Sequence, residues 1–185
     1  MKKIKIILGM LFLLSSMSFA TGLQLNVAGK GIPASQEVNG LRLNLIYGKT
    51  EAVKGVDFNL VALGDTDNFK GLQIGMLGAN RIENTFKGAG IGVVNIHKGD
   101  STGLLWGLVN VSKDVKGVRY GFVNYSKGRS TVDLGTVNIS QSSAFQMGLF
   151  NKTDDLTGVQ LGLINMAKTG FLPIFPFFNI DGRIF

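Results

Sequence analysis

Apolar residues alternate with polar or small residues in short segments that recur along most of the chain. The segments follow the pattern Gly-h-x-h-Gly-h-h-Asn, in which h is apolar, and the clearest copies begin at Gly103, Gly117 and Gly158. Apolar residues at every second position are typical of a β-strand with one buried face. Two glycines per copy disfavour a helix, because each costs about 1 kcal/mol relative to alanine. The pattern predicts an all-β protein whose alternating apolar residues face the core.

Two columns of residues keep their spacing from copy to copy. Weaker copies begin at Gly40, Gly55, Gly71, Gly88, Thr131 and Ala144. The central glycines are Gly75, Gly92, Gly107, Gly121, Gly135, Gly148 and Gly162, with Asn44 and Asn59 at this position in the two earliest copies. The closing asparagines are Asn95, Asn110, Asn124, Asn138, Asn151, Asn165 and Asn179, which lie 13 to 15 residues apart. A short, regular period indicates a repeat protein with units of about 14 residues.

Two folds satisfy such a repeat. In a narrow β-solenoid each copy is one coil, like positions stack about 4.8 Å apart, and the asparagines form a ladder that bonds to the backbone of the next coil. The alternative is an antiparallel β-meander or an outer-membrane β-barrel. We favour the solenoid, because every copy carries the same motif in the same order. The chain also has only one Trp and three Tyr for the aromatic girdles of a barrel.

The polar positions inside the motif suggest which residues become neighbours. Arg42 precedes Asp57 by one copy and Arg119 precedes Asp133, so each pair is expected on adjacent strands at the solvent surface. Gln73, Gln146 and Gln160 lie beside the central glycine, on the side opposite the alternating apolar residues. We therefore expect these glutamines on a flat outer face that could dock a partner or a second copy of the chain.

The two ends differ from the repeats. Three early lysines, an apolar run over 6–14 and the tripeptide Ser18-Phe19-Ala20 predict an export signal over residues 1–20 that is cleaved after Ala20. The location would be the periplasm, the outer membrane or the cell surface. Residues 21–39 are expected to cap one end of the repeat domain, which covers 40–170. Residues 171–185 are rich in Phe and Pro and are expected to cap the other end.

Composition argues against most kinds of chemistry. The chain has no Cys and one His, which excludes disulfides, thiolate metal sites and multi-histidine metal sites. The formal net charge of +7 falls to +4 without the three lysines of the leader, and basic residues are scattered, so nucleic-acid binding is not expected. We expect His97 in a solvated turn and no cofactor. Asp65 and Asp67 predict an Asx turn, and a weak calcium site there stays open.

Several segments resemble a known family. The opening segment Gly40–Lys49, the Gly-x-Gln-x-Gly copies and the closing Leu-Pro-Ile-Phe-Pro-Phe-Phe-Asn over 172–179 resemble the leptospiral-type surface-repeat family of exported bacterial proteins. Asn44, Asn59, Thr131 and Ala144 depart from that family's pattern. The resemblance implies an exported envelope or surface protein, and it implies no established activity.

The sequence thus predicts a structural or binding protein without catalysis. Its partner would be an unidentified component of the envelope or cell surface, and membrane association and homo-oligomerisation both stay open. The alternative function, tied to the barrel fold, is anchoring or passage of small solutes.

Overall fold

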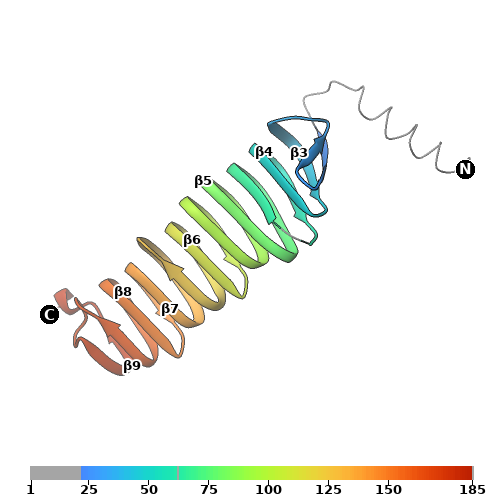
Figure 1. Cartoon of the computed structure of the whole chain (residues 1–185). Helices are drawn as coiled ribbons and strands as arrows, with labels where there is room; N and C mark the ends of the chain where they lie inside the picture. Colours follow the sequence, from blue (N-terminus) through green and yellow to red (C-terminus); the bar gives the residue numbers. More distant parts are fainter. Residues whose placement is uncertain (1–21, 62, 185) are drawn as a thin grey trace, which may run out of the picture.

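The chain forms a β-solenoid (Figure 1). The computed structural model describes residues 22–184 except residue 62, so the expected leader and its cleavage site at Ala20 lie outside the described residues. About 85% of the structure is strand, wound into about nine turns of about 15 residues each. The predicted solenoid is therefore confirmed. Among the described residues there is no helix with the length and apolar character needed to cross a membrane.

The strands form one sheet that wraps around the axis of the solenoid. They are β1 (Leu23–Val27), β2 (Lys30–Ile32), β3 (Glu37–Asn44), β4 (Tyr47–Asn59), β5 (Leu63–Trp106), β6 (Val109–Ser126), β7 (Arg129–Met147), β8 (Phe150–Ala167) and β9 (Ile174–Ile180), followed by a 3₁₀ turn at Gly182–Ile184. Strands β1 and β3 to β8 pair in parallel, one after another. The antiparallel meander, open or closed into a barrel, is therefore not the fold of these residues.

Like positions of the motif lie one above another. Arg42 pairs with Asp57, and the leading glycine Gly40 pairs with Gly55, which pairs with Gly71. The leading glycines from Gly40 to Gly117 have φ between +126° and +150°. A Cβ at each of them would also strike the main-chain carbonyl of the glycine one coil earlier. Only glycine fits these six positions from Gly40 to Gly117, because a side chain would be both strained and too close to the neighbouring coil.

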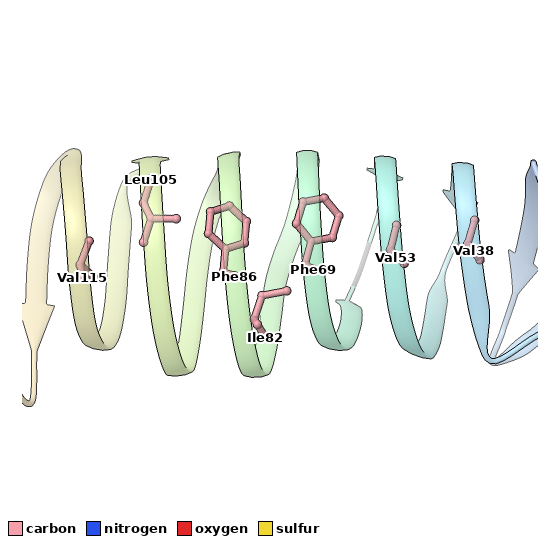
Figure 2. Close-up of a cluster of buried hydrophobic side chains, with 7 residues drawn as sticks. All are labelled: Val38, Val53, Phe69, Ile82, Phe86, Leu105 and Val115. Carbon is pink, nitrogen blue, oxygen red and sulfur yellow. The ribbon is translucent and has the colours of Figure 1, made fainter.

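The interior is mainly polar. Among the described residues nine apolar side chains are buried, against 31 polar or charged ones. The apolar ones form a thin strip that includes Val38, Val53, Phe69, Phe86 and Val115, drawn in Figure 2. The rings of Phe69 and Phe86 stack with centroids 5.5 Å apart. The prediction that the alternating apolar residues build the core is therefore wrong, and most of them lie outside.

An asparagine ladder runs through the interior, as predicted. Each Nδ2 donates to the Oδ1 of the next asparagine, along the series Asn26, Asn44, Asn59, Asn80, Asn95, Asn110, Asn124, Asn138, Asn151 and Asn165. From Asn80 onward the same Nδ2 also donates to a main-chain carbonyl of the next coil, at 2.9 to 3.2 Å. Both amide protons are used, so burial leaves no donor of the ladder unpaired.

The glycine columns make room for the ladder. A Cβ at Gly121 would lie 2.7 Å from Asn110 Nδ2 and in collision with the carbonyl of Gly107. In the first coils the central glycine and the ladder asparagine exchange places. Asn44 occupies the central position and Gly48 follows, where a Cβ would lie 2.9 Å from Asn26 Nδ2. Asn44 and Asn59 are therefore members of the ladder rather than irregular copies of the glycine column.

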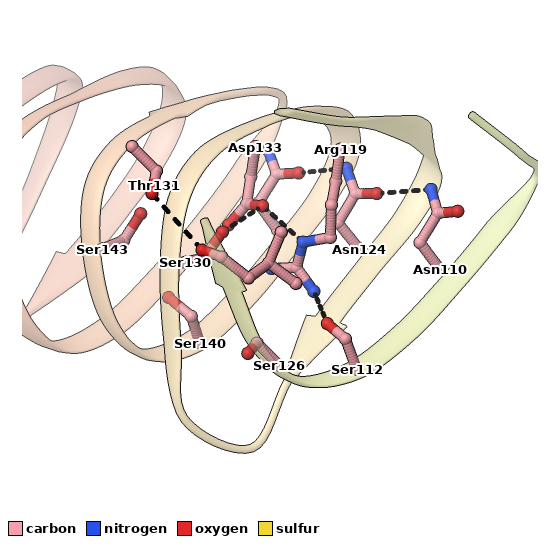
Figure 3. A network of polar contacts seen from close by, with 12 residues as sticks. Asn110, Ser112, Arg119, Asn124, Ser126, Ser130, Thr131, Asp133, Ser140 and Ser143 are labelled. Carbon is pink, nitrogen blue, oxygen red and sulfur yellow. Dashed lines mark hydrogen bonds and ion pairs between the residues drawn. The ribbon is translucent and has the colours of Figure 1, made fainter. Parts of the chain in front are cut away.

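Two ion pairs lie inside the part of the solenoid that the structure describes. Arg42 Nε and Nη2 donate to both carboxylate oxygens of Asp57, at 2.8 and 2.7 Å, and Arg119 Nε donates to Asp133 Oδ1 at 2.7 Å. All four side chains are fully buried. The predicted pairing is confirmed, but the predicted solvent position is wrong. Figure 3 shows Arg119 and Asp133 beside the ladder, with Ser112 accepting from Arg119 Nη1.

The ends close the stack with antiparallel strands. At the N-terminal end β2 pairs antiparallel with β1, and β1 pairs in register with β3, so the parallel stack starts within residues 21–39. At the C-terminal end β9 runs antiparallel to β8, and Phe175 O accepts the last ladder bond. Asn179 pairs with Gln160 and donates to Leu172 O. Its predicted place in the asparagine column is therefore wrong, because β9 reverses direction.

Replacing Asn124 by Ala tests the ladder. The substitution removes the acceptor of Asn110 Nδ2 and the donor to Asn138 Oδ1 and Leu134 O. Each buried group left without a partner costs about 1–3 kcal/mol, so we expect the free energy of unfolding to fall by about 3 kcal/mol. Urea unfolding followed by circular dichroism measures it. The control is Lys127→Ala, an exposed site in the same coil, and equal stability of the two variants would contradict the ladder's role.

Candidate functional site: the apolar face

One side of the solenoid presents an almost wholly apolar sheet to solvent. It is formed by the first, third, fifth and sixth residues after the leading position of each copy, and we call it the apolar face. Its members in chain order are Leu41, Leu43, Leu45, Ile46; Val56, Phe58, Leu60, Val61; Leu72, Ile74, Met76, Leu77; Ala89, Ile91, Val93, Val94; Leu104, Trp106, Leu108, Val109; Val118, Tyr120, Phe122, Val123; Val132, Leu134, Thr136, Val137; Phe145, Met147, Leu149, Phe150; and Val159, Leu161, Leu163, Ile164. Apart from the aromatic residues Trp106 and Tyr120, Thr136 is the only one of these described residues whose side chain carries a polar group.

The side chains of this face are half-buried or exposed. Leu108 is 61% exposed, Phe122 is 60% exposed, and Trp106 and Tyr120 are 53% and 54% exposed. Trp106 and Tyr120 meet edge to face across neighbouring coils, with ring centroids 6.1 Å apart. Scattered exposed apolar residues are ordinary, but a continuous apolar surface of this kind marks an interaction site.

A shallow groove runs along the apolar face. It spans the coils from Gly75 to Gly162, and its volume is about 1080 Å³. The central glycines form its floor, because the ladder behind them excludes any side chain at that position. Residues such as Trp106 and Tyr120 line it on one side, and Leu108 and Phe122 line it on the other. The glycine column therefore shapes both the interior and the outer surface.

The C-terminal strand extends the apolar face by one more strand. In β9, Phe178 pairs with Leu161, and Ile180 pairs with Val159. Phe177 is opposite Gly162 and is one of the most exposed large side chains. The aromatic C-terminal segment thus closes the parallel stack with a strand that is itself apolar on its outer side.

The predicted docking surface of glutamines does not exist. Gln73, Gln146 and Gln160 are fully buried. Gln160 Nε2 donates to Gln146 Oε1 at 2.7 Å, and Gln73 Nε2 donates to Asp57 Oδ2 at 2.9 Å. Alternation fixes which residues share a side of the strand, but it does not say which side is inside. The polar side chains at this position lie inside, where they bond in pairs across neighbouring coils, as Arg119 does with Asp133.

The sequence contains a signal that the apolar side of the strands lies outside. The fifth and sixth positions of the motif are both apolar, as in Phe122-Val123, and neighbouring residues of a flat strand cannot both face the core. The structure turns a corner here, so that both side chains lie on the outside. Two adjacent apolar residues followed by a buried asparagine are typical of such an outer corner.

A row of lysines borders the apolar face. Lys54, Lys70, Lys87 and Lys116 each come directly before a leading glycine, and all are exposed; we call them the lysine row. Lys54 pairs with Lys70 in the sheet, and the stacked leading glycines place the others in line. None of the four forms an ion pair with a residue that the structure describes. The row does not stand out in the sequence, because the same position in other coils is occupied by Thr102, Ser130, Ser143 and Thr157.

His97 lies inside the solenoid, not in a solvated turn as predicted. It is buried against Phe86, with ring centroids 4.5 Å apart, and its Nδ1 is 2.8 Å from Ser101 Oγ. Burial lowers the pKa of His97 from 6.5 to about 3. A neutral imidazole sealed from solvent has no access to a substrate, so His97 is a structural residue.

The acidic residues singled out in the sequence are not grouped. Asp65 is buried and its main-chain carbonyl accepts from Arg42 Nη1, whereas Asp67 is partly exposed. Within residues 22–184, apart from residue 62, no cluster of three or more His, Cys, Asp or Glu side chains is placed to hold a metal ion. Comparison of the chain with protein families, with curated protein sequences and with solved structures gives no significant match. The surface itself therefore has to indicate the function.

The pKa of His97 predicts a specific loss of stability in acid. Between pH 6.5 and pH 3 the unfolded chain binds a proton at this residue that the folded chain does not, so the free energy of unfolding falls as the pH is lowered. The fall is about 1.4 kcal/mol per pH unit at most, or about 2 kcal/mol from pH 6.5 to 5. Urea midpoints of the wild type and of His97→Gln, measured at pH 7.5 and 5, isolate this contribution. Parallel pH dependence of the two proteins would refute it.

Proposed function

We propose that the protein is an exported, non-catalytic binding protein of the cell envelope or cell surface, and that the apolar face is the surface with which it binds. The observation that carries the proposal is the reversed polarity of the fold: ion pairs and amides lie inside, and apolar side chains lie outside. Apolar surface that is exposed to water is unfavourable, and binding of a partner that covers this surface lowers the free energy. A protein with such a surface is expected to function while bound to an apolar partner.

Export supports the same assignment. Residues 1–20 have the basic, apolar and small-residue order of an export signal. The opening and closing motifs resemble the leptospiral-type surface-repeat family, whose members are exported. An envelope location would also bring the apolar face next to membranes and membrane proteins.

The proposal gives the interior a structural role only. His97 and the Arg119–Asp133 pair are of the kinds most often used in catalysis, but their side chains are buried, and Arg119 Nε donates to Asp133 Oδ1 inside the solenoid. The groove on the apolar face is lined mainly by glycine and apolar residues. Such a surface recognises shape and apolar character, and it offers no acid or base to a substrate.

Fractionation of cells that export the protein tests the proposal. The test variant L108E/F122E adds two carboxylates to the apolar face at side chains that are about 60% exposed, so folding is expected to survive. The matched control N84E/Q141E adds the same charge at exposed residues outside the face. We expect the wild type and the control to sediment with the envelope, and at least tenfold more of the test variant to be released by an alkaline carbonate wash.

Circular dichroism of both variants first confirms that the β-structure is intact. Equal retention of the two folded variants would contradict the proposal, because binding would then not use the apolar face. Release of the wild type into the soluble fraction would contradict it as well.

A further inference from the structure

We propose that the partner of the apolar face is the surface of a lipid bilayer rich in anionic phospholipid, on which the solenoid lies flat. This inference rests on the proposed function and names the chemistry of the partner. It depends on the charges around the face rather than on the face alone.

The positive charge of the lysine row favours a partner that carries negative charge. Lys54, Lys70, Lys87 and Lys116 lie one residue before the leading glycine after which the apolar face begins, and no described carboxylate pairs with them. The first residue after each of these glycines is apolar and faces outward, as Val56 does after Lys54 and Gly55. A long lysine side chain beside an apolar surface can extend its ammonium group to phosphate while its methylenes stay in apolar surroundings. The pattern matches an element that lies in a membrane interface.

Aromatic residues on the face have the composition expected at such an interface. Trp106 and Tyr120 combine an apolar ring with a polar group, and both are more than half exposed. Phe177 and Phe178 on β9 add exposed rings at the C-terminal end. Trp and Tyr are enriched where a protein meets lipid headgroups, because one end of each side chain is apolar and the other is polar.

A second copy of the chain fits the charges less well. In a two-fold dimer the same surface meets itself, so the lysine row lies over either its own counterpart or the opposite border of the face. That opposite border leads through residues such as Val109 and Val111 to Lys113 and Lys127. Neither arrangement brings a row of carboxylates to the lysine row. Anionic headgroups supply the missing charge directly.

The chain contains its own reporter of this contact. Trp106 is the only tryptophan in the protein, and it lies on the apolar face. The protein, purified from the cell that exports it, is titrated with vesicles of phosphatidylcholine alone or of phosphatidylcholine with about 40% of the anionic lipid phosphatidylglycerol. We expect a blue shift of Trp106 emission and co-sedimentation with the anionic vesicles, both weakened by high salt.

The lysine row is tested by the variant K70Q/K87Q. Each lysine near an anionic surface contributes about fivefold to binding (about 1 kcal/mol), so we expect the partition coefficient on anionic vesicles to fall about 25-fold. The matched control K113Q/K127Q removes the same charge from exposed lysines that lie away from the row, and its effect should be smaller than fivefold.

The outcomes separate this inference from the proposed function. Equal binding to neutral and anionic vesicles, or equal effects of the two double variants, would overturn the assignment of an anionic surface and leave the apolar face as a binding surface. A dimer that buries Trp106 without any binding to vesicles would overturn it too, and would make a second copy the partner. A monomer with hydrated Trp106 that binds neither vesicles nor envelopes would overturn both proposals.

Discussion

The asparagine ladder requires that like positions of successive coils lie directly above one another. Each amide bonds to the amide and to a main-chain carbonyl of the next coil, so a coil that slipped by one residue would leave several buried groups unpaired. The ladder also needs space, which the central glycines provide. What remains of the interior is narrow, and it is filled by side chains that can pair along the axis, such as Gln146 with Gln160. The large apolar side chains of the motif are left on the outside.

The apolar face is therefore a consequence of how the interior is satisfied. Most globular proteins gain stability by burying apolar surface, whereas this solenoid relies on main-chain pairing between coils, ladder hydrogen bonds, a thin apolar strip and two internal ion pairs. A buried ion pair adds little net stability, but loss of one partner would leave the other charge buried and unpaired. Because the motif repeats, each outward apolar position recurs once per coil, and the side chains at that position form a continuous column. A folding requirement thus produces a broad surface suited to a partner that is itself flat and apolar.

The sequence predicts the repeat well and the polarity poorly. The spacing of Asn110, Asn124 and Asn138 was enough to predict a solenoid with an internal ladder, because only parallel stacking brings every copy into register. Gln146 was placed on the wrong side, since alternation is the same whichever side is buried. His97 was misplaced because its burial depends on packing against Phe86, and Asn179 was misplaced because it lies on a strand that reverses direction. These outcomes depend on contacts between coils, which one strand does not encode.

Cysteine accessibility tests the reversed polarity most directly. The natural chain has no Cys, so single substitutions such as Gln146→Cys and Met147→Cys report on one position each in the free protein. We expect a maleimide to react readily with the cysteine at 147 and with one at 149, and to react at 146 only on unfolding. The opposite pattern, with 146 reactive and 147 and 149 protected, would mean that the apolar residues form the core, and it would contradict this account of the fold and of its binding surface.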